Sequence, residues 1–149
     1  MRHFILAAGL LLACTAFAQT PAADDALYQA WGGQTGIRAV MDDFVPRLFD
    51  DPRTARFFKG VDRDNLTVQL TDQLCQQSGG PCVYKGKDMK LIHEDLNIGR
   101  GDFNALVEIL QQSMNARGIP FAAQNGMLAR LAPMHREIIT PVSDLQPRR

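Results

Sequence analysis

Histidine and cysteine are scarce in this sequence, and their scarcity narrows the metal chemistry that the chain can support. Only three residues of each type occur among 149, and one of each falls within the first 18 residues. The others are His93, His135, Cys75 and Cys82. Two histidines cannot build a multi-histidine zinc centre or a di-iron centre. A mixed site of Cys75, Cys82 and His93 would lack a fourth ligand, and its spacing matches no familiar zinc pattern.

The sequence has no excess of positive or negative charge. Sixteen Lys and Arg residues balance sixteen Asp and Glu residues, for a formal net charge of +0 at pH 7. Without a basic stripe, we expect no nucleic-acid partner. The glycine-rich loops that hold phosphates or dinucleotides are missing. Nothing near His93 suggests the nucleophile of a Ser-His-Asp or Cys-His enzyme.

Long hydrophobic runs are absent, and the longest apolar segment lies at the start of the chain. It spans residues 4–13, follows Arg2 and precedes the small-x-small sequence at 16–18. These features predict a signal peptide over residues 1–18 and a mature domain over 19–149. The run is shorter than the roughly 20 residues that a membrane span needs. We therefore expect export, to the periplasm.

Cys14 offers an alternative fate for the exported chain. It ends the sequence Leu-Leu-Ala-Cys at residues 11–14, which resembles a lipoprotein processing site. We expect the protein to associate with a membrane only if Cys14 is lipidated.

Helical periodicity dominates the remaining chain, and alternating strand patterns are missing. We expect six or seven helices in an all-α domain, without repeats or an internal linker. The expected helices cover residues 24–31, 34–48, 62–78, 87–96, about 103–114 and about 124–140. Pro46 should kink the second helix or end it early. Cys75 and Cys82 lie across a helix end, where a disulfide and two separate thiols are equally compatible with the sequence.

His93 stands on the apolar side of the short helix at 87–96, together with Met89 and Leu96. The interior that it faces is expected to contain Phe44, Phe58, Leu66, Leu70, Leu74 and Met89. One interpretation is a core histidine whose ring bonds to a backbone carbonyl. The other is an imidazole that holds the iron of a flat apolar cofactor, as in haem proteins.

Five segments, taken in order, resemble a group I truncated haemoglobin. They read LYQAWGG at 27–33, DDFVPRLF at 42–49, FF at 57–58, QLCQQSGGPCVYKGKDMKLIH at 73–93 and LAPMHREI at 131–138. The resemblance covers residues 25–141. It implies a truncated globin-like two-over-two helical sandwich that binds haem b, with His93 as the metal ligand. Phe58 would stack on the porphyrin, and Tyr84, Met89 and Ile98 would border the proximal side.

The distal side departs from the family pattern. Where the family often places a tyrosine and a glutamine that donate hydrogen bonds to dioxygen, this chain aligns Val45 and Leu70. Leu66 and Leu74 continue the apolar lining beside Phe44. Gln69 and Gln73 flank this stripe, where two positions are compatible with the sequence: side chains turned inward, or the solvated positions that we expect. The resemblance thus implies a pentacoordinate iron in an apolar pocket that reversibly binds O2, NO or CO but retains O2 weakly.

Three other functions are compatible with the sequence. The same iron could serve an enzyme, through nitric oxide dioxygenation or a peroxidase-like reaction. A gas or redox sensor could be gated by Cys75 and Cys82. A helical binding module without haem is the third. An unidentified reductase would be needed to keep the iron ferrous outside the cytoplasm.

Overall fold

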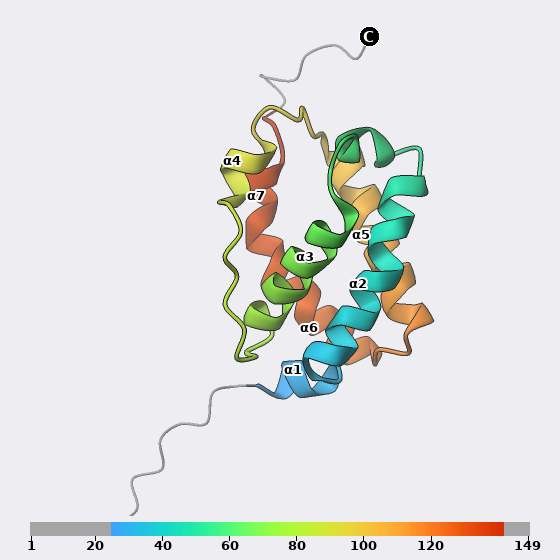
Figure 1. Cartoon of the computed structure of the whole chain (residues 1–149), viewed down its shortest axis with the longest axis vertical. Helices are drawn as coiled ribbons and strands as arrows, with labels where there is room; N and C mark the ends of the chain where they lie inside the picture. Colours follow the sequence, from blue (N-terminus) through green and yellow to red (C-terminus); the bar gives the residue numbers. More distant parts are fainter. Residues whose placement is uncertain (1–24, 142–149) are drawn as a thin grey trace, which may run out of the picture.

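The computed structural model describes residues 25–141 (Figure 1). The predicted signal peptide and Cys14 lie outside this part of the chain, so both stay predictions. Among the described residues, no helix is both long enough and apolar enough to cross a membrane.

Every regular element in the described part of the chain is helical, which confirms the all-α prediction. The elements are α1 (Ala26–Ala30), α2 (Gly33–Asp50), the 3-10 turn η1 (Ala55–Phe58), α3 (Arg63–Gln77), α4 (Met89–His93), α5 (Arg100–Ala116), α6 (Phe121–Leu131), the 3-10 turn η2 (Ala132–Met134) and α7 (His135–Ile138).

The helices form two layers around one apolar core. In Figure 1, α2 and α3 lie in front of α5 and α6. Helix α2 packs against both α3 and α5, while α6 packs against α1 and α3. The core is built from the apolar sides of α2, α3, α5 and α6 and includes Trp31, Ile37, Val40, Met41, Phe44, Leu48, Leu74, Ile109, Leu110, Met114 and Met127. This arrangement is the expected two-over-two sandwich.

Pro46 does not end α2 early. The helix runs through Pro46 for another turn, to Asp50. Proline removes the backbone hydrogen bond to the carbonyl of Asp42. Because Asp42 and Pro46 both lie on the exposed side of α2, water can reach that carbonyl.

The expected single helix over residues 124–140 is wrong. Residues 121–138 instead form α6, η2 and α7, and Pro133 lies in the first turn of η2. Proline has no N–H for a helical bond and crowds the carbonyl four residues earlier, so the helix changes direction there. The break lets α7 pack against α4 while α6 stays in the rear layer.

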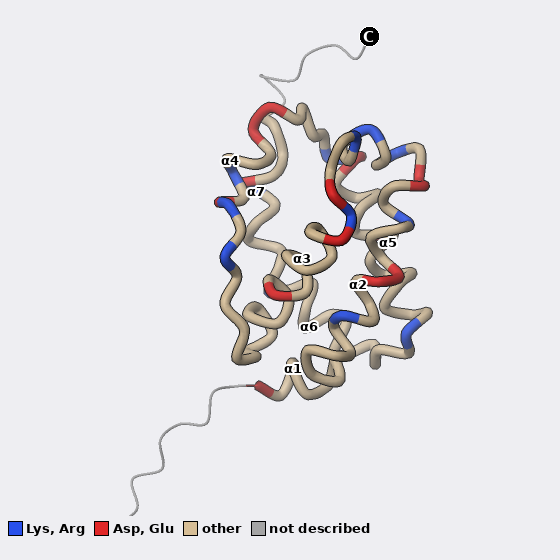
Figure 2. The backbone as a smooth tube through the Cα atoms, in the orientation of Figure 1, with Lys and Arg blue, Asp and Glu red and all other residues tan. Residues whose placement is uncertain are grey.

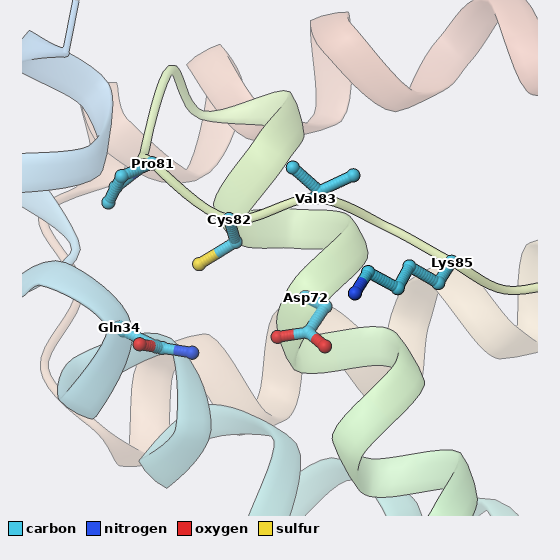
Figure 3. Close-up of a pocket in the computed structure, with 6 residues that line it drawn as sticks. All are labelled: Gln34, Asp72, Pro81, Cys82, Val83 and Lys85. Atoms are coloured by element: carbon cyan, nitrogen blue, oxygen red, sulfur yellow. The ribbon is translucent and has the colours of Figure 1, made fainter.

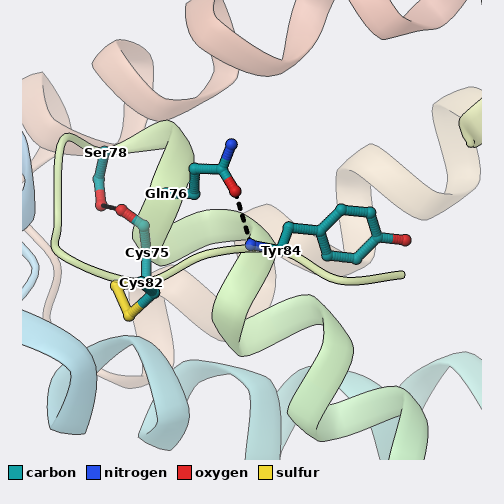
Figure 4. The surroundings of a disulfide bond; sticks show 5 residues. All are labelled: Cys75, Gln76, Ser78, Cys82 and Tyr84. Carbon is teal, nitrogen blue, oxygen red and sulfur yellow. Dashed lines mark hydrogen bonds between the residues drawn. A yellow bond between two sulfur atoms is a disulfide. The ribbon is translucent and has the colours of Figure 1, made fainter. Parts of the chain in front are cut away.

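Cys75 and Cys82 form a disulfide, which decides between the two alternatives that the sequence left open (Figure 4). The bond joins the last turn of α3 to the irregular segment 79–88. Gly80 lies close beneath this junction. A Cβ atom at that position would stand 2.6 Å from the ring of Tyr28 and 2.7 Å from Sγ of Cys75. The close approach therefore requires glycine.

Basic and acidic residues are interspersed along the described backbone (Figure 2). On α2, Arg47 Nε lies 2.6 Å from an oxygen of Asp43, and Arg117, which follows α5, reaches the other carboxylate oxygen at 3.9 Å. These contacts lower the pKa of Asp43, chiefly through the hydrogen bond from Arg47. The Asp43 side chain is 19% exposed, so its ion pair is only partly screened by water.

The lowered pKa makes Asp43 a source of acid sensitivity. The unfolded chain holds the Asp43 proton more tightly than the folded chain does. The stabilisation is therefore fully present above the unfolded pKa, about 3.9, and is lost as the pH falls through the lower folded pKa. We expect Asp43→Asn to reduce the free energy of unfolding at pH 7 by about 0.3–1 kcal/mol. Denaturant unfolding should show this difference fading towards pH 2.

The neighbouring pair Arg38–Asp42 provides a matched control. It has the same spacing on α2, with 2.7 Å between its charged atoms, but both side chains are more exposed. Asp42→Asn should therefore cost less than Asp43→Asn. A loss for Asp43→Asn that persisted at pH 2 would show that packing, and not the ion pair, causes it.

Candidate functional site

His93 ends the short helix α4, which begins at an aspartate cap. Oδ1 of Asp88 accepts hydrogen bonds from the backbone N–H groups of Lys90 and Leu91, at 3.0 and 3.2 Å. These bonds satisfy donors that a helix start would otherwise leave open. The cap sets the direction of α4, and His93 follows one turn later.

The ring of His93 is held in one orientation by its own helix. Nδ1 lies 2.6 Å from the carbonyl oxygen of Met89, and the ring is partly buried. Because a carbonyl only accepts, Nδ1 carries the proton in the neutral ring, and Nε2 keeps its lone pair. Among the described residues, Nε2 has no partner. An imidazole whose other nitrogen bonds to a carbonyl is a usual arrangement for a metal ligand.

The three leucines along one side of α3 differ in how deeply they are buried. Leu74 belongs to the core, Leu70 packs against the core and Leu66 is partly buried. The buried hydroxyls of Thr67 and Thr71 donate back to carbonyls of the same helix, at 2.9 and 2.7 Å. These threonines are therefore already engaged, and the apolar character of the stripe is kept.

Val45 and Phe44 are adjacent on α2 but belong to different surroundings. Phe44 is part of the core cluster, whereas Val45 is 1% exposed and lies outside that cluster.

Phe58, from η1, packs against the core and contacts Phe49 with ring centroids 5.3 Å apart. Ile98 is buried after α4, and its carbonyl accepts the N–H of Thr140 at 3.0 Å.

The expected solvated position of Gln73 is wrong. Gln73 is only 7% exposed, and its Nε2 lies 3.4 Å from Sδ of Met89 and 3.6 Å from Sδ of Met134. The side chain thus joins α3 to α4 and η2. Thioether sulfur is a weak acceptor, so the amide is only modestly satisfied. Sequence reasoning missed this contact because Met134 is distant along the chain.

A hollow of about 250 Å³ lies between α3 and the segment that leads into α4. Two of the predicted site residues, Tyr84 and Met89, line it, together with Gln73 and Met134. Tyr84 donates through its hydroxyl to the carbonyl of Lys87 at 3.1 Å, and partial burial raises its pKa. His93, Leu66 and Leu70 do not line this hollow.

A second hollow, of about 430 Å³, lies at the surface between α2, α3 and the start of the segment 79–88 (Figure 3). Its walls are formed by Gln34, Asp72, Pro81, Cys82, Val83 and Lys85. It contains none of the predicted site residues. Neither hollow brings His93 together with the leucines of α3, so their joint role in one site stays a prediction.

Comparisons with known proteins identify the family of the chain. The Bacterial-like globin family matches residues 26–140. A Group 1 truncated hemoglobin of Tetrahymena pyriformis is 34% identical over 99 residues, which cover 66% of this chain and 82% of the relative.

Solved structures show the same fold. The truncated hemoglobin of Tetrahymena pyriformis in its Fe(III) form is 30% identical, with a TM-score of 0.73. The match covers 77% of this chain and 98% of that protein. The 2/2 hemoglobin of Synechococcus, at 19% identity and a TM-score of 0.71, covers 76% and 97% and is similar in fold. By family match, identity and helical arrangement, the chain belongs to the group 1 truncated haemoglobins.

Proposed function

We propose that this protein binds haem b and, through it, reversibly binds diatomic gases. The observation that carries the proposal is the geometry of His93, whose Nδ1 bonds to the carbonyl of Met89 and whose Nε2 has no partner among the described residues. When bound, haem supplies an iron that can take one axial ligand from the protein and a gas on its other face. His93 would hold this iron as its single protein ligand, which would leave one coordination position for the gas.

The surrounding residues fit a flat, mostly apolar group. Leu66 and Leu70 are partly buried on α3, and Met89 begins α4. Phe58 offers an aromatic ring and Ile98 a buried aliphatic side chain. Apolar side chains of this kind exclude water from the cofactor and strengthen the hold of a single imidazole.

The distal positions can be assigned by spacing. Solved variants of the Tetrahymena pyriformis protein replace one tyrosine and two glutamines. The intervals from that tyrosine to the two glutamines equal the intervals from Val45 to Leu66 and from Val45 to Leu70. We infer that these three residues form the distal wall. None of the three side chains can donate a hydrogen bond.

A donor-free distal wall favours ligand exchange over oxygen retention. Bound dioxygen carries partial negative charge, and a hydrogen bond to such a group is worth about 1.5–3 kcal/mol. Carbon monoxide and nitric oxide depend less on such donors. Nitric oxide dioxygenation requires dioxygen to be retained until nitric oxide arrives, so the leucines make gas binding the better-supported function.

The disulfide supports the proposal that the protein is exported to an oxidising compartment such as the periplasm, because structural disulfides are rare in the cytoplasm. We expect mass spectrometry of the exported protein to find Gln19 as its first residue. An acylated Cys14 at the N-terminus would instead support the lipid-anchored alternative, and an intact residue 1 would contradict both.

Replacement of His93 tests the axial assignment. We expect His93→Ala to lose the haem Soret band of the purified protein, or to lose the five-coordinate ferrous spectrum, because the change removes the imidazole that is proposed to hold the iron. Absorption spectra of the ferric, ferrous and CO-exposed protein provide the measurement.

His135 is the matched control for that experiment. Its ring packs edge-on against Phe103, with centroids 4.8 Å apart, and it is similarly half-buried. His135→Ala should retain haem and its spectra. A His93→Ala protein with the parent's spectra would reject the axial role.

Introduction of a distal donor tests the apolar pocket. We expect Val45→Tyr and, separately, Leu70→Gln to slow dioxygen release by about 10- to 150-fold, as one added hydrogen bond to a charged acceptor would. Stopped-flow displacement of dioxygen by carbon monoxide measures this rate. Release of carbon monoxide should change far less in the same variants.

Gln73 is the residue most able to contradict this expectation. If its amide left Met89 and donated to the bound gas, Gln73→Leu would speed dioxygen release, and Val45→Tyr would add little. With Gln73 engaged as described, Gln73→Leu should leave the release rate within about twofold of the parent, since no hydrogen bond to the gas is lost.

A further inference from the structure

We propose that the Cys75–Cys82 disulfide positions the axial histidine, so that the thiol state of this pair affects the bond between His93 and iron. The inference rests on the proposed haem-binding function. It assigns to the two cysteines a positioning role that depends on their covalent link.

One end of the link is fixed in the core. Cys75 is 0% exposed and belongs to the same cluster as Trp31 and Leu74. Its carbonyl accepts the hydroxyl of Ser78 at 2.9 Å, and the carbonyl of Ser78 accepts the N–H of Tyr28 at 3.2 Å. The last turn of α3 is thereby tied to α1 and cannot shift without disturbing the core.

The other end of the link lies in a segment with little support of its own. Residues 79–88 form neither helix nor strand. Beyond Cys82, the N–H of Tyr84 donates to Oε1 of Gln76 at 2.6 Å, in an exposed position (Figure 4). Water competes for such a bond, which makes it a weak restraint. The disulfide is the strong attachment of this segment to α3.

That segment leads directly into the helix that carries His93. Helix α4 has five residues, far fewer than a helix needs to be stable alone, and Leu91 in it is 64% exposed. Its position therefore depends on its neighbours. After α4, the bond between Ile98 and Thr140 ties the chain to the end of α7. Before α4, the disulfide acts together with the contact between Gln73 and Met89 and with the exposed bond from Tyr84 to Gln76.

Loss of the disulfide would remove the covalent restraint upstream of α4 and leave only the weaker contacts of Met89 with Gln73 and of Tyr84 with Gln76. Segment 79–88 and the first turn of α4 could then move away from α3 while the core stays folded. His93 would keep its bond to Met89, since both belong to α4, but the whole helix could tilt relative to the leucines. The bond to iron would lengthen or vary in angle.

The disulfide can be reached by a reductant. Cys82 lines the surface hollow with Pro81 and Val83 (Figure 3). Reduction by a trialkylphosphine breaks the S–S bond. The two sulfur atoms each gain a proton, and the phosphine becomes its oxide by taking the oxygen of one water molecule. Two electrons pass from phosphorus to the sulfur pair.

The test compares the ferrous, haem-loaded full chain before and after treatment with tris(2-carboxyethyl)phosphine. Thiol titration establishes that both cysteines are reduced. We expect the iron–histidine stretching band in resonance Raman spectra to shift or broaden. Transfer of haem to an apoprotein acceptor should become about tenfold faster. The free energy that a disulfide commonly contributes to stability exceeds the free-energy difference that corresponds to a tenfold change.

Two variants separate positioning from general stability. The double variant Cys75→Ala, Cys82→Ala should behave like the reduced protein and should not respond to the phosphine. Trp31→Phe removes the hydrogen bond from Nε1 to the carbonyl of Ala123, 3.1 Å long, and weakens the core without touching the disulfide. It should keep the parent's iron–histidine band and its response to reduction.

Two outcomes would contradict the positioning role of the disulfide, and they can be told apart. A reduced protein and a double variant that unfold more easily, but keep the parent's iron–histidine band and haem transfer rate, would limit the disulfide to a structural role and overturn the inference. A parent protein that binds no haem in any state would overturn the proposed function, and the inference with it.

Discussion

The hydrogen bond between the His93 ring and the carbonyl of Met89 is the interaction on which the proposed site depends. It links two residues one turn apart in the same short helix, so the ring orientation follows from α4 itself. Because the carbonyl can only accept, the proton is kept on Nδ1 and the lone pair on Nε2. A histidine with both nitrogens bonded to protein could not hold a metal, and one with neither bonded would rotate.

That arrangement fixes the ring within α4 but leaves open how α4 is placed. A helix of five residues gains little stability from its own hydrogen bonds. Its placement comes from α7 on one side, and from the disulfide and Gln73 on the side of α3. The break at Pro133 also helps to place α4, because it ends α6 and lets α7 pack against α4. The position of His93 therefore depends on several features that are remote from it in the sequence.

Sequence patterns predicted most of the fold but not these supports. The long helices α2, α3 and α5 follow from apolar spacing, which depends only on near neighbours in the chain. Pro46 and Pro133 interrupt similar patterns, yet α2 continues, since it packs along its length against α3 and α5, while the last helix breaks. Local spacing cannot distinguish the two cases.

The burial of Gln73 was unpredictable for a related reason, and it bears on the polarity of the proposed site. An amide on the flank of a leucine stripe is ordinarily solvated, and only the distant sulfur atoms of Met89 and Met134 make burial acceptable here. The glutamine thus occupies the seam between α3 and α4, while Val45, Leu66 and Leu70 carry no donor. The one buried amide of α3 is therefore engaged with these two sulfur atoms, and the three residues proposed for the distal wall are left without a donor.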